Sequence, residues 1–325
     1  MPTSSVARSL FSGIVDYAGL FPPASLSMED AVREYATRRL TRERWMLGRF
    51  VVPASDLAEF SRVAIAVRSE VSEDESLWPV TVVATDDIEE NVEAMRRLHA
   101  AQQGAIRPLA ISGIETRVSE PEQVRGAVGH LTEFSPERYV EIPLDRDPAP
   151  FITAIREVGV RAKARTGGVK PESIPPASQV ARFLAECVRQ DVPFKLTAGL
   201  HHPIRAEYPL TYQENSERAV MHGFLNTFLA VALLHGGGSM EDAVRLLEET
   251  DASAFTFGDH SISWRDREFT EVALGDARRL ATGFGSCSFA EPVEGLRELG
   301  ALSDGLGTRS YPGKAAGEER REAPM

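Results

Sequence analysis

Residues 160–168 read V-R-A-K-A-R-T-G-G, and residues 193–203 read P-F-K-L-T-A-G-L-H-H-P. Both segments have the length of short β-strands, and strand side chains alternate between two faces. Lys163 and Arg165 therefore share one face of the first segment, and Lys195 leaves the second segment on the face opposite its apolar neighbours. Strands of a parallel sheet are normally apolar on both faces. Charge at the carboxyl ends of two such strands is typical of the catalytic end of a barrel.

The chain around these two segments repeats a strand–helix order. The predicted strands are residues 13–17, 46–52, 79–84, 106–112, 138–144, the two segments above and 283–289. The predicted helices between them are residues 28–40, 56–68, 86–103, 120–131, 148–158 and 178–190. Eight strands that each precede a helix predict a (β/α)8 barrel, the TIM-barrel fold. A doubly wound open sheet would instead show a glycine-rich turn after the first strand, and G-L-F-P-P at residues 19–23 lacks that fingerprint.

The regular order breaks between the seventh and eighth strands. Predicted helices there are residues 217–234, 239–249 and 268–280, and residues 255–264 form a predicted hairpin. We therefore expect a single barrel domain over residues 1–302, with a helical insertion at about 203–281. Residues 303–325, rich in glycine and charged side chains, are predicted to be a disordered tail.

Composition limits the classes of partner. The 325 residues carry 36 Lys and Arg against 48 Asp and Glu, a net charge of −12, which argues against nucleic acid and anionic membranes. The first 30 residues show no secretory signal, and no apolar run reaches the roughly 18 residues of a membrane span. Two cysteines form neither a disulfide framework nor a zinc site. We expect a cytoplasmic protein whose partner is a small anionic molecule, with homo-oligomerisation left open.

Polar residues of strands five to seven converge inside such a barrel. Those expected to face inward are Glu141, Lys163, Arg165, Lys195 and Thr197. Neighbouring parallel strands lie about 4.8 Å apart, so these side chains can reach one another. One interpretation is a salt-bridge cluster that fills a layer of the barrel. We favour the other, a functional site, because buried charges are costly unless they are used.

Two adjacent lysines suggest a specific chemistry. Repulsion and desolvation would lower the pKa of one of them, and a neutral lysine can attack a carbonyl carbon to form a Schiff base. Lys163 is the predicted nucleophile and Lys195 the neighbour that perturbs it. Glu141, or His201 just past strand seven, would move the proton. The same charges would also suit a carboxylate or phosphate that is held without a covalent step.

The two lysine segments also carry a resemblance. K-A-R-T-G-G at 163–168 and K-L-T-A-G at 195–199 resemble lysine segments of class I aldolases of the deoxyribose-phosphate type. G-S-C-S at 285–288 resembles the phosphate loop of those enzymes. The resemblance implies Schiff-base lyase chemistry and substrate contacts from Thr166, Gly167, Gly168 and Gly199.

As a whole, the chain resembles an uncharacterised bacterial family of (β/α)8-barrel-like proteins. The resemblance rests on the segments above, on D-Y-A-G-L-F-P-P at 16–23 and on H-G-F-L-N at 222–226. That family implies a barrel and no particular activity. In the present chain, Asp16 and the proline-containing segment after it are candidates for one wall of the substrate site.

Loops at the carboxyl ends of the strands supply further candidates. Ser286, Cys287 and Ser288 precede a helix, where free amides and hydroxyls predict an anion site. A serine-capped turn is the alternative there, and a nucleophilic Cys287 is a weaker one. Adjacent side chains point apart in an extended chain, so of His201 and His202 we expect one in the pocket and one in a structural role.

The last candidates lie on the first helix of the insertion. His222 and Asn226 are four residues apart, so they share one helical face. That face either lines the pocket or forms a hydrogen-bonded core pair.

We therefore predict an enzyme for a small phosphorylated or carboxylated carbonyl compound, of Schiff-base aldolase or lyase type and without a cofactor. Arg165, Thr197 and the 285–288 loop would hold the anionic end. One alternative is a metal-dependent lyase or isomerase that uses Asp16, Glu141 and a loop histidine around a divalent cation. Another is a barrel that binds a small acid without catalysis.

Overall fold

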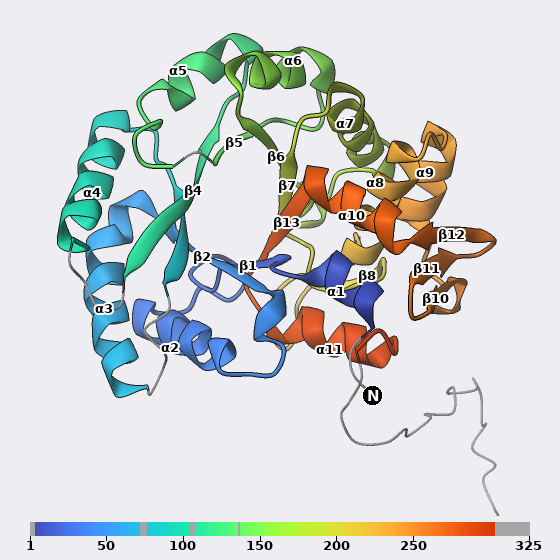
Figure 1. The fold of residues 1–325 in the computed structure, drawn as a ribbon, viewed down its shortest axis with the longest axis horizontal. Helices are drawn as coiled ribbons and strands as arrows, with labels where there is room; N and C mark the ends of the chain where they lie inside the picture. Colours follow the sequence, from blue (N-terminus) through green and yellow to red (C-terminus); the bar gives the residue numbers. More distant parts are fainter. Residues whose placement is uncertain (1–3, 72–76, 104–107, 136, 303–325) are drawn as a thin grey trace, which may run out of the picture.

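A computed structural model of the chain describes residues 4–71, 77–103, 108–135 and 137–302. Eight parallel strands close into a barrel in the spatial order β1-β13-β7-β6-β5-β4-β3-β2 (Figure 1). They are β1 (Val15–Tyr17), β2 (Leu47–Pro53), β3 (Trp78–Val83), β4 (Leu109–Arg117), β5 (Arg138–Glu141), β6 (Arg161–Arg165), β7 (Phe194–Thr197) and β13 (Ala281–Ser286). The predicted (β/α)8 barrel is confirmed.

Helices surround the barrel (Figure 1). They include α1 (Ser5–Phe11), α2 (Met28–Arg39), α3 (Leu57–Glu70), α4 (Ile88–Ala101), α5 (Val124–Gly129), α6 (Pro148–Val158), α7 (Ala177–Gln190) and α11 (Ala290–Glu298). Ser27, Asp87 and Asp147 begin α2, α4 and α6 by accepting a hydrogen bond from a backbone amide of the first turn. Apolar side chains fill the layer between helices and strands, where the rings of Tyr35 and Trp78 are buried 4.9 Å apart.

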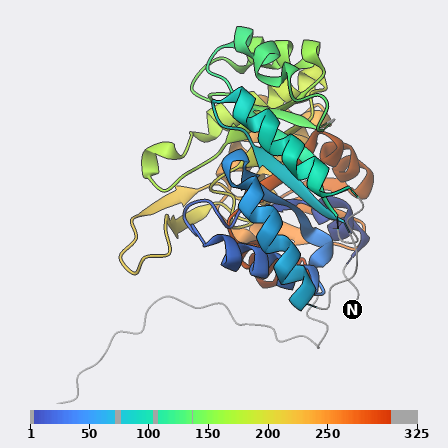
Figure 2. The ribbon, with the colours of Figure 1, turned by 90° about the vertical axis from the view of Figure 1, so that its left-hand side faces the viewer.

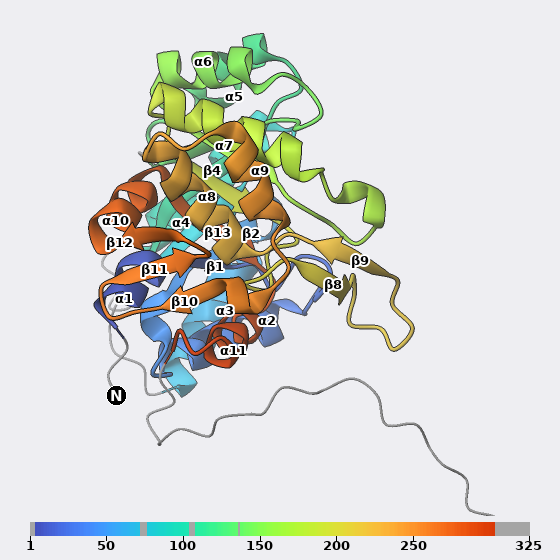
Figure 3. The ribbon, with the colours of Figure 1, turned by 90° about the vertical axis from the view of Figure 1, so that its right-hand side faces the viewer.

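The segment between β7 and β13 is the insertion. It begins with β8 (Ala206–Pro209) and β9 (Arg218–Met221), an antiparallel hairpin that projects from the barrel (Figures 2 and 3). It continues with α8 (Phe224–His235), α9 (Met240–Glu248), the antiparallel strands β10 (Phe255–Phe257), β11 (Ser261–Trp264) and β12 (Arg267–Thr270), and α10 (Glu271–Leu280). Helix α8 packs on the barrel, because the ring of Phe224 stacks 4.9 Å from that of Phe284 in β13.

The predicted helical character of the insertion needs two corrections. Residues 218–221 were expected to open a helix, but they form β9, and α8 begins only at Phe224. Residues 268–270 were also placed in a helix and belong to β12, the third strand of the small sheet. Both segments pair with a neighbouring strand, and backbone pairing of this kind outweighs local helix propensity.

Strand β4 is longer than expected, and this extension positions the site. Its pairing with β3 shifts by one residue, so that Val80 faces Ile111 and Thr81 faces Gly113. A shift of this kind is a β-bulge, and it changes the direction in which the side chains after it point. A Cβ at position 113 would lie 2.9 Å from Nη1 of Arg49 and 3.0 Å from Oγ1 of Thr81, so a larger residue there would displace one of these side chains. Beyond the bulge, Glu115 enters the barrel.

The register of β5, β6 and β7 aligns the inward polar residues. Glu141 lies opposite Lys163, and Lys163 lies opposite Lys195. Two residues further along the same pair of strands, β6 and β7, Arg165 lies opposite Thr197. The alternation predicted from the sequence is therefore correct for these strands, and it places charge where barrels usually carry branched apolar side chains.

Two remaining expectations concern the ends of the chain and membranes. The predicted tail, residues 303–325, lies outside the described residues. Within the described ranges, no helix combines the length and the apolar character needed to cross a membrane.

The amino-terminal helix α1 is joined to the insertion by a hydrogen bond. Arg278 of α10 donates this bond, of 3.0 Å, to the carbonyl oxygen of Ser12.

Candidate active site

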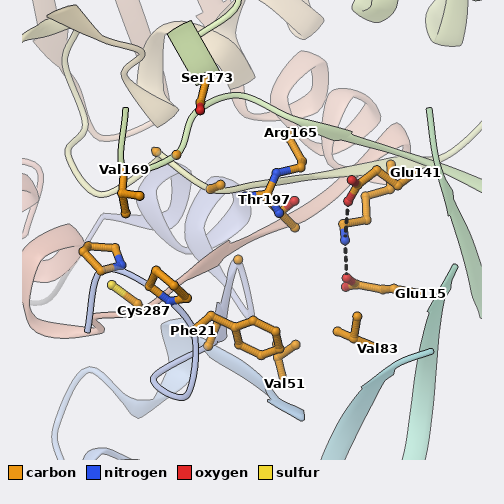
Figure 4. A pocket seen from close by; sticks show the side chains of 18 of the residues that line it. Phe21, Val51, Val83, Glu115, Glu141, Arg165, Val169, Ser173, Thr197 and Cys287 are labelled. Atoms are coloured by element: carbon orange, nitrogen blue, oxygen red, sulfur yellow. Dashed lines mark ion pairs between the residues drawn. The ribbon is translucent and has the colours of Figure 1, made fainter. Parts of the chain in front are cut away.

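A cavity of about 730 Å³ opens at the carboxyl ends of the barrel strands. Its apolar side includes Phe21, Val51 and Val83, which lie together in Figure 4. The charged lining residues include Glu115, which lies next to Val83 in Figure 4, and Glu141. A volume of this size suits a small organic ligand, and the polar groups would fix its orientation.

Five charged side chains form the lysine–carboxylate cluster inside the barrel. They are Asp16 of β1, Glu115 of β4, Glu141 of β5, Lys163 of β6 and Lys195 of β7. The Nζ atom of Lys163 lies 2.6 Å from Oε2 of Glu115 and 2.8 Å from Oε2 of Glu141 (Figure 4). The Nζ atom of Lys195 lies 2.6 Å from Oε1 of Glu115 and 2.5 Å from Oδ2 of Asp16. Glu115 therefore contacts both amines, one with each oxygen.

Asp16 is held in place by the neighbouring strand. The backbone amide of Arg49 in β2 donates a hydrogen bond of 2.8 Å to Oδ1 of Asp16. Gly48 leaves room for this carboxylate, because a Cβ at that position would lie only 2.4 Å from Oδ1. The other oxygen of Asp16 is then free to accept from Lys195. Asp16 thus belongs to the cluster rather than to a wall of the cavity.

The cluster changes the electrostatics expected from the sequence. Burial disfavours charge on Lys195, but the carboxylates of Asp16 and Glu115 outweigh burial and raise the pKa of Lys195 above its ordinary value. Burial likewise opposes ionisation of Glu115, yet Lys163 and Lys195 hold the pKa of Glu115 at about 2. The expected repulsion between the lysines is wrong as a description of this site, because Glu115 bridges the two amines.

Two arginines at the rim of the cavity point to an anionic ligand. Arg117 of β4 and Arg165 of β6 both line the cavity and are exposed. Within the described part of the chain, neither forms an ion pair. Close to Arg165 in Figure 4 lies Thr197, whose Oγ1 atom is buried without a hydrogen-bond partner among the described residues. Unpaired cations beside an unused hydroxyl can bind a carboxylate or phosphate.

The rim arginines give a test of anion binding. We expect inorganic phosphate and pyruvate to raise the melting temperature of the protein, and Arg165→Gln to weaken the affinity about tenfold, since a charged hydrogen bond is lost. Arg182→Gln removes an exposed cation on α7, away from the cavity, and should bind like the wild type. Titration calorimetry would measure both dissociation constants. Unchanged affinity in Arg165→Gln would remove this residue from the anion site.

The two adjacent histidines have different surroundings. Nδ1 of His201 lies 3.0 Å from Oε2 of Glu291 and 3.2 Å from Oγ of Ser286. Burial opposes charge on His201, but contacts with Cys287 and Glu291 raise its pKa to about 9. The ring of His202 stacks on Tyr208 at 3.7 Å, and burial lowers the pKa of His202 to about 4. Both rings line the cavity.

The 285–288 loop, predicted to bind an anion, is largely occupied by its own side chains. Ser286 Oγ accepts a hydrogen bond of 3.3 Å from the amide of Ser288. Ser288 Oγ accepts one of 3.2 Å from the amide of Glu291, in the first turn of α11. The carboxylate of Glu291 adds negative charge beside the loop. These contacts correspond to the serine-capped turn, so we transfer the anion-binding role to the rim arginines.

The T-G-G and A-G segments pack against each other. Thr166 Oγ1 donates a hydrogen bond of 2.7 Å to the carbonyl oxygen of Ala198. Gly167 and Gly199 approach so closely that a Cβ on either would lie 2.9 Å from the other's Cα. Gly199 also has φ +78°, which favours glycine. Of these residues, Gly168 and Gly199 line the cavity, while Thr166 holds the two loops together.

His222 and Asn226 do not line the cavity. Nε2 of His222 lies 2.7 Å from the carbonyl oxygen of Pro175, and burial lowers the pKa of this histidine to about 4. The amide of Asn226 donates to the carbonyl oxygens of Leu246 and Glu249, both at 2.9 Å. His222 lies before α8 and Asn226 in its first turn, so the predicted shared helical face is wrong. Both side chains are buried and hydrogen-bonded, which favours a core role over substrate binding.

The structure therefore brings together most of the predicted site and adds residues to it. Predicted residues that line the cavity are Glu141, Lys163, Arg165, Gly168, Lys195, Thr197, Gly199, His201, His202 and Cys287. Unforeseen polar or aromatic ones are Glu115, Arg117, Tyr208, Tyr212 and Glu291. For Glu115 and Arg117, the only sequence signal was the alternation of I-E-T-R after Gly113. Tyr208, Tyr212 and Glu291 reach the cavity only because the chain folds, and no local pattern indicates them.

Comparisons with known proteins add little to this geometry. No protein-family model and no curated protein sequence matches the chain. Among solved structures, the chain is similar to Xanthomonas albilineans dihydropteroate synthase in complex with indole-2-carboxylic acid and 6-chloroguanine. The identity is 12%, the match covers 90% of this chain and 94% of that one, and the TM-score is 0.25. The fold assignment rests on the barrel topology itself.

Proposed function

We propose that the protein is an enzyme that forms an imine between Lys163 and an anionic carbonyl compound, as an aldolase or lyase does. The observation that carries the proposal is the choice of lysine at the cavity. The chain contains only four lysines, at positions 163, 170, 195 and 314, and uses arginine for its other cations. Two of the four meet in one cluster. Arginine cannot be deprotonated in proteins, whereas lysine can become a nucleophile.

Lys163 is the better nucleophile of the two. Its side chain lines the cavity and contacts Glu141, which also lines it. Lys195 is only 1% exposed and lies against the ring of Tyr139, with Nζ 5.4 Å from the ring centroid. Its raised pKa keeps Lys195 charged, so it serves as the fixed countercharge for Asp16 and Glu115.

The proposed reaction starts with the ammonium form of Lys163. The anionic end of the ligand binds Arg165 and Arg117, and the carbonyl reaches the amine. Lys163 passes one proton to Glu141, and its nitrogen attacks the carbonyl carbon to give a carbinolamine. Glu141 then returns the proton to the hydroxyl group of the carbinolamine, which leaves as water. Glu115 remains ionised throughout because its pKa is about 2. The product is an iminium cation.

The cluster suits an iminium cation for an electrostatic reason. The two carboxylates of Glu115 and Glu141 lie within 2.8 Å of Nζ of Lys163 and stabilise positive charge at that atom. Forming the iminium keeps this charge in place, so the surrounding groups need not reorganise. The cation then accepts electrons from an adjacent C–C or C–H bond, which breaks.

The metal-dependent alternative fits the side chains less well. Asp16 and Glu141, the carboxylates it would use, each contact a lysine amine within 2.8 Å. His201 contacts Glu291 instead of either carboxylate. Among the described residues, no three His, Cys, Asp or Glu side chains are arranged to hold a metal ion. An ammonium group already occupies the position that a cation would take between these oxygens.

Borohydride trapping tests the proposal. We expect sodium borohydride, added with pyruvate or glyceraldehyde 3-phosphate, to fix a covalent adduct that increases the protein mass. Because the chain has four lysines, peptide mapping can assign the adduct, and we expect it at Lys163. Lys163→Met should abolish trapping at this site.

Lys170→Met is the matched control, since Lys170 is exposed on the loop after β6 and should trap like the wild type. An adduct at Lys195 would keep the chemistry and reverse the roles of the two lysines. If no carbonyl compound in a broader panel gives an adduct with folded protein, the cluster serves only to bind an acid.

A further inference from the structure

A second reactive group faces the same cavity from the side of β13. Cys287 directly follows that strand and lines the cavity, together with His201 and Glu291. The Sγ atom of Cys287 lies 3.9 Å from Nδ1 of His201, which in turn lies 3.0 Å from Oε2 of Glu291. The thiol and the carboxylate thus approach the same ring nitrogen of His201, which places a nucleophile beside a histidine that is charge-paired with a carboxylate.

The surroundings of the histidine favour proton transfer. His201 is 7% exposed, and its Nδ1 atom lies 3.2 Å from Oγ of Ser286. Because the pKa of His201 is about 9, the ring is protonated at pH 7 and places a proton donor beside the sulfur. An adjacent imidazolium also stabilises a cysteine thiolate. The carboxylate of Glu291 fixes the ring and balances its charge.

A tyrosine from the loop of the β8–β9 hairpin contacts both Cys287 and Glu291. The hydroxyl of Tyr212 lies 3.5 Å from Sγ of Cys287 and donates a hydrogen bond of 3.1 Å to Oε2 of Glu291. Tyr212 is itself 56% exposed, so solvent and ligands reach the hydroxyl that covers the sulfur. The hairpin therefore shields Cys287 without sealing it.

The other cysteine of the chain, Cys187, provides an internal control for the reactivity of Cys287. Cys187 lies in α7, fully buried among apolar side chains. Burial raises the pKa of the Cys187 thiol well above its ordinary value. Among the described residues its sulfur has no hydrogen-bond partner, and its position is that of an inert core residue. Both thiols are buried, but they differ in their partners and in access to the cavity.

We propose that Cys287 is a second covalent site, a nucleophile that adds reversibly to aldehydes in the cavity, with the imidazolium of His201 stabilising its thiolate and Glu291 as a positioning residue. The sulfur bonds to the aldehyde carbon, and the C=O π bond breaks. The thiol proton leaves to solvent, and the imidazolium of His201 donates a proton to the former carbonyl oxygen, giving a thiohemiacetal. His201 then regains a proton from solvent. Atoms and charge balance without an oxidant or a further reactant. The proposal does not depend on an imine at Lys163.

Alkylation of the folded full-length chain by iodoacetamide, followed by mass spectrometry, tests this assignment. We expect Cys287 to react at least about tenfold faster than Cys187, and His201→Asn to slow Cys287 by about tenfold at pH 7. Propanal should protect Cys287 from alkylation in the wild type. Equal rates for the two cysteines, or full reactivity in folded His201→Asn, would overturn the proposal.

The pH profile of alkylation distinguishes positioning from simple packing. The titratable groups around Cys287 are His201, Glu291, Tyr212, His202 and Tyr17. Glu291→Gln should shift the profile of the Cys287 rate, whereas Tyr212→Phe should leave the profile in place and raise the rate. An unshifted profile in Glu291→Gln would contradict its positioning role. Cys287 should still react in Lys163→Met, which separates this site from the proposed imine.

Discussion

Replacing Glu115 by glutamine is expected to lower the free energy of unfolding by about 3 kcal/mol at pH 7, the largest single effect of any carboxylate in the barrel. The side chain is 2% exposed and contacts both lysine amines at 2.6 Å. An amide in its place leaves each buried amine with one carboxylate fewer. Removing one partner of a buried ion pair costs far more than removing a surface charge, because the remaining charge stays desolvated.

The pH dependence of this variant follows from the lowered pKa of Glu115. The folded value, about 2, lies below the ordinary value of 4.5, so the stabilisation is fully present above pH 4.5 and is lost as the pH falls towards 2. The difference between wild type and Glu115→Gln should be constant from pH 7 to pH 5 and should shrink below pH 4.5.

Urea unfolding at several pH values would measure the Glu115 effect. Glu59→Gln, on the exposed face of α3, is the control and should change the free energy by less than about 0.5 kcal/mol. A Glu115→Gln protein as stable as the Glu59→Gln control would show that the bridge between the lysines contributes nothing to the fold.

The second large effect is expected from Lys195→Met, with a loss of about 3–5 kcal/mol in unfolding free energy at pH 7. The methionine leaves Asp16 buried without its amine partner, whereas Glu115 keeps its contact with Lys163. A buried carboxylate without a countercharge is stable only when protonated, and this now applies to Asp16. Acidification should therefore restore the variant, and its deficit should already shrink between pH 7 and pH 5.

The pH range separates the two variants. Glu115→Gln should keep its deficit above pH 5, whereas Lys195→Met should recover there. Lys170→Met removes an exposed lysine and serves as the control, with an expected change within about 0.5 kcal/mol. A deficit in Lys195→Met that does not change with pH would mean that lost packing, rather than an unpaired carboxylate, destabilises it.

The polar face of β6 and β7 was predictable from the sequence because strand alternation is a local property. Lys163 and Lys195 are separated from their apolar neighbours by parity alone, and the parallel register places them side by side. Parity also placed Glu141 in the barrel. Wherever a strand is regular, its inward residues can be read directly from the chain.

Glu115 was missed because β4 is irregular. The predicted strand ended at residue 112, since Gly113 reads as a strand breaker. In the structure, the bulge at this point lets the strand continue to Arg117. A bulge depends on the partner strand and on the close approach of Arg49, neither of which is visible in the local sequence. The electrostatic prediction for the two lysines failed for the same reason.

The histidine side of the cavity was unpredictable for a different reason. Cys287 and His201 lie 86 residues apart in the chain and meet only because β7 and β13 pair in the barrel. Likewise, R-A-V-M at 218–221 resembles the start of an apolar helix and is held as a strand by its partner β8. Pairing between strands distant in the sequence determines both features, and such pairing cannot be predicted from the local sequence.

The bridge between Asp16 and Lys195 has a consequence for the order of folding. These residues are 179 positions apart, and their contact requires the first strand to meet the last part of the barrel. Until the ring closes, the lysines lack their countercharges and remain best solvated by water. We therefore expect the ion pairs to form late, after most apolar surface is buried. Interactions absent from the folding transition state act mainly on the rate of unfolding, so we expect loss of the cluster to speed unfolding of the barrel more than it slows folding.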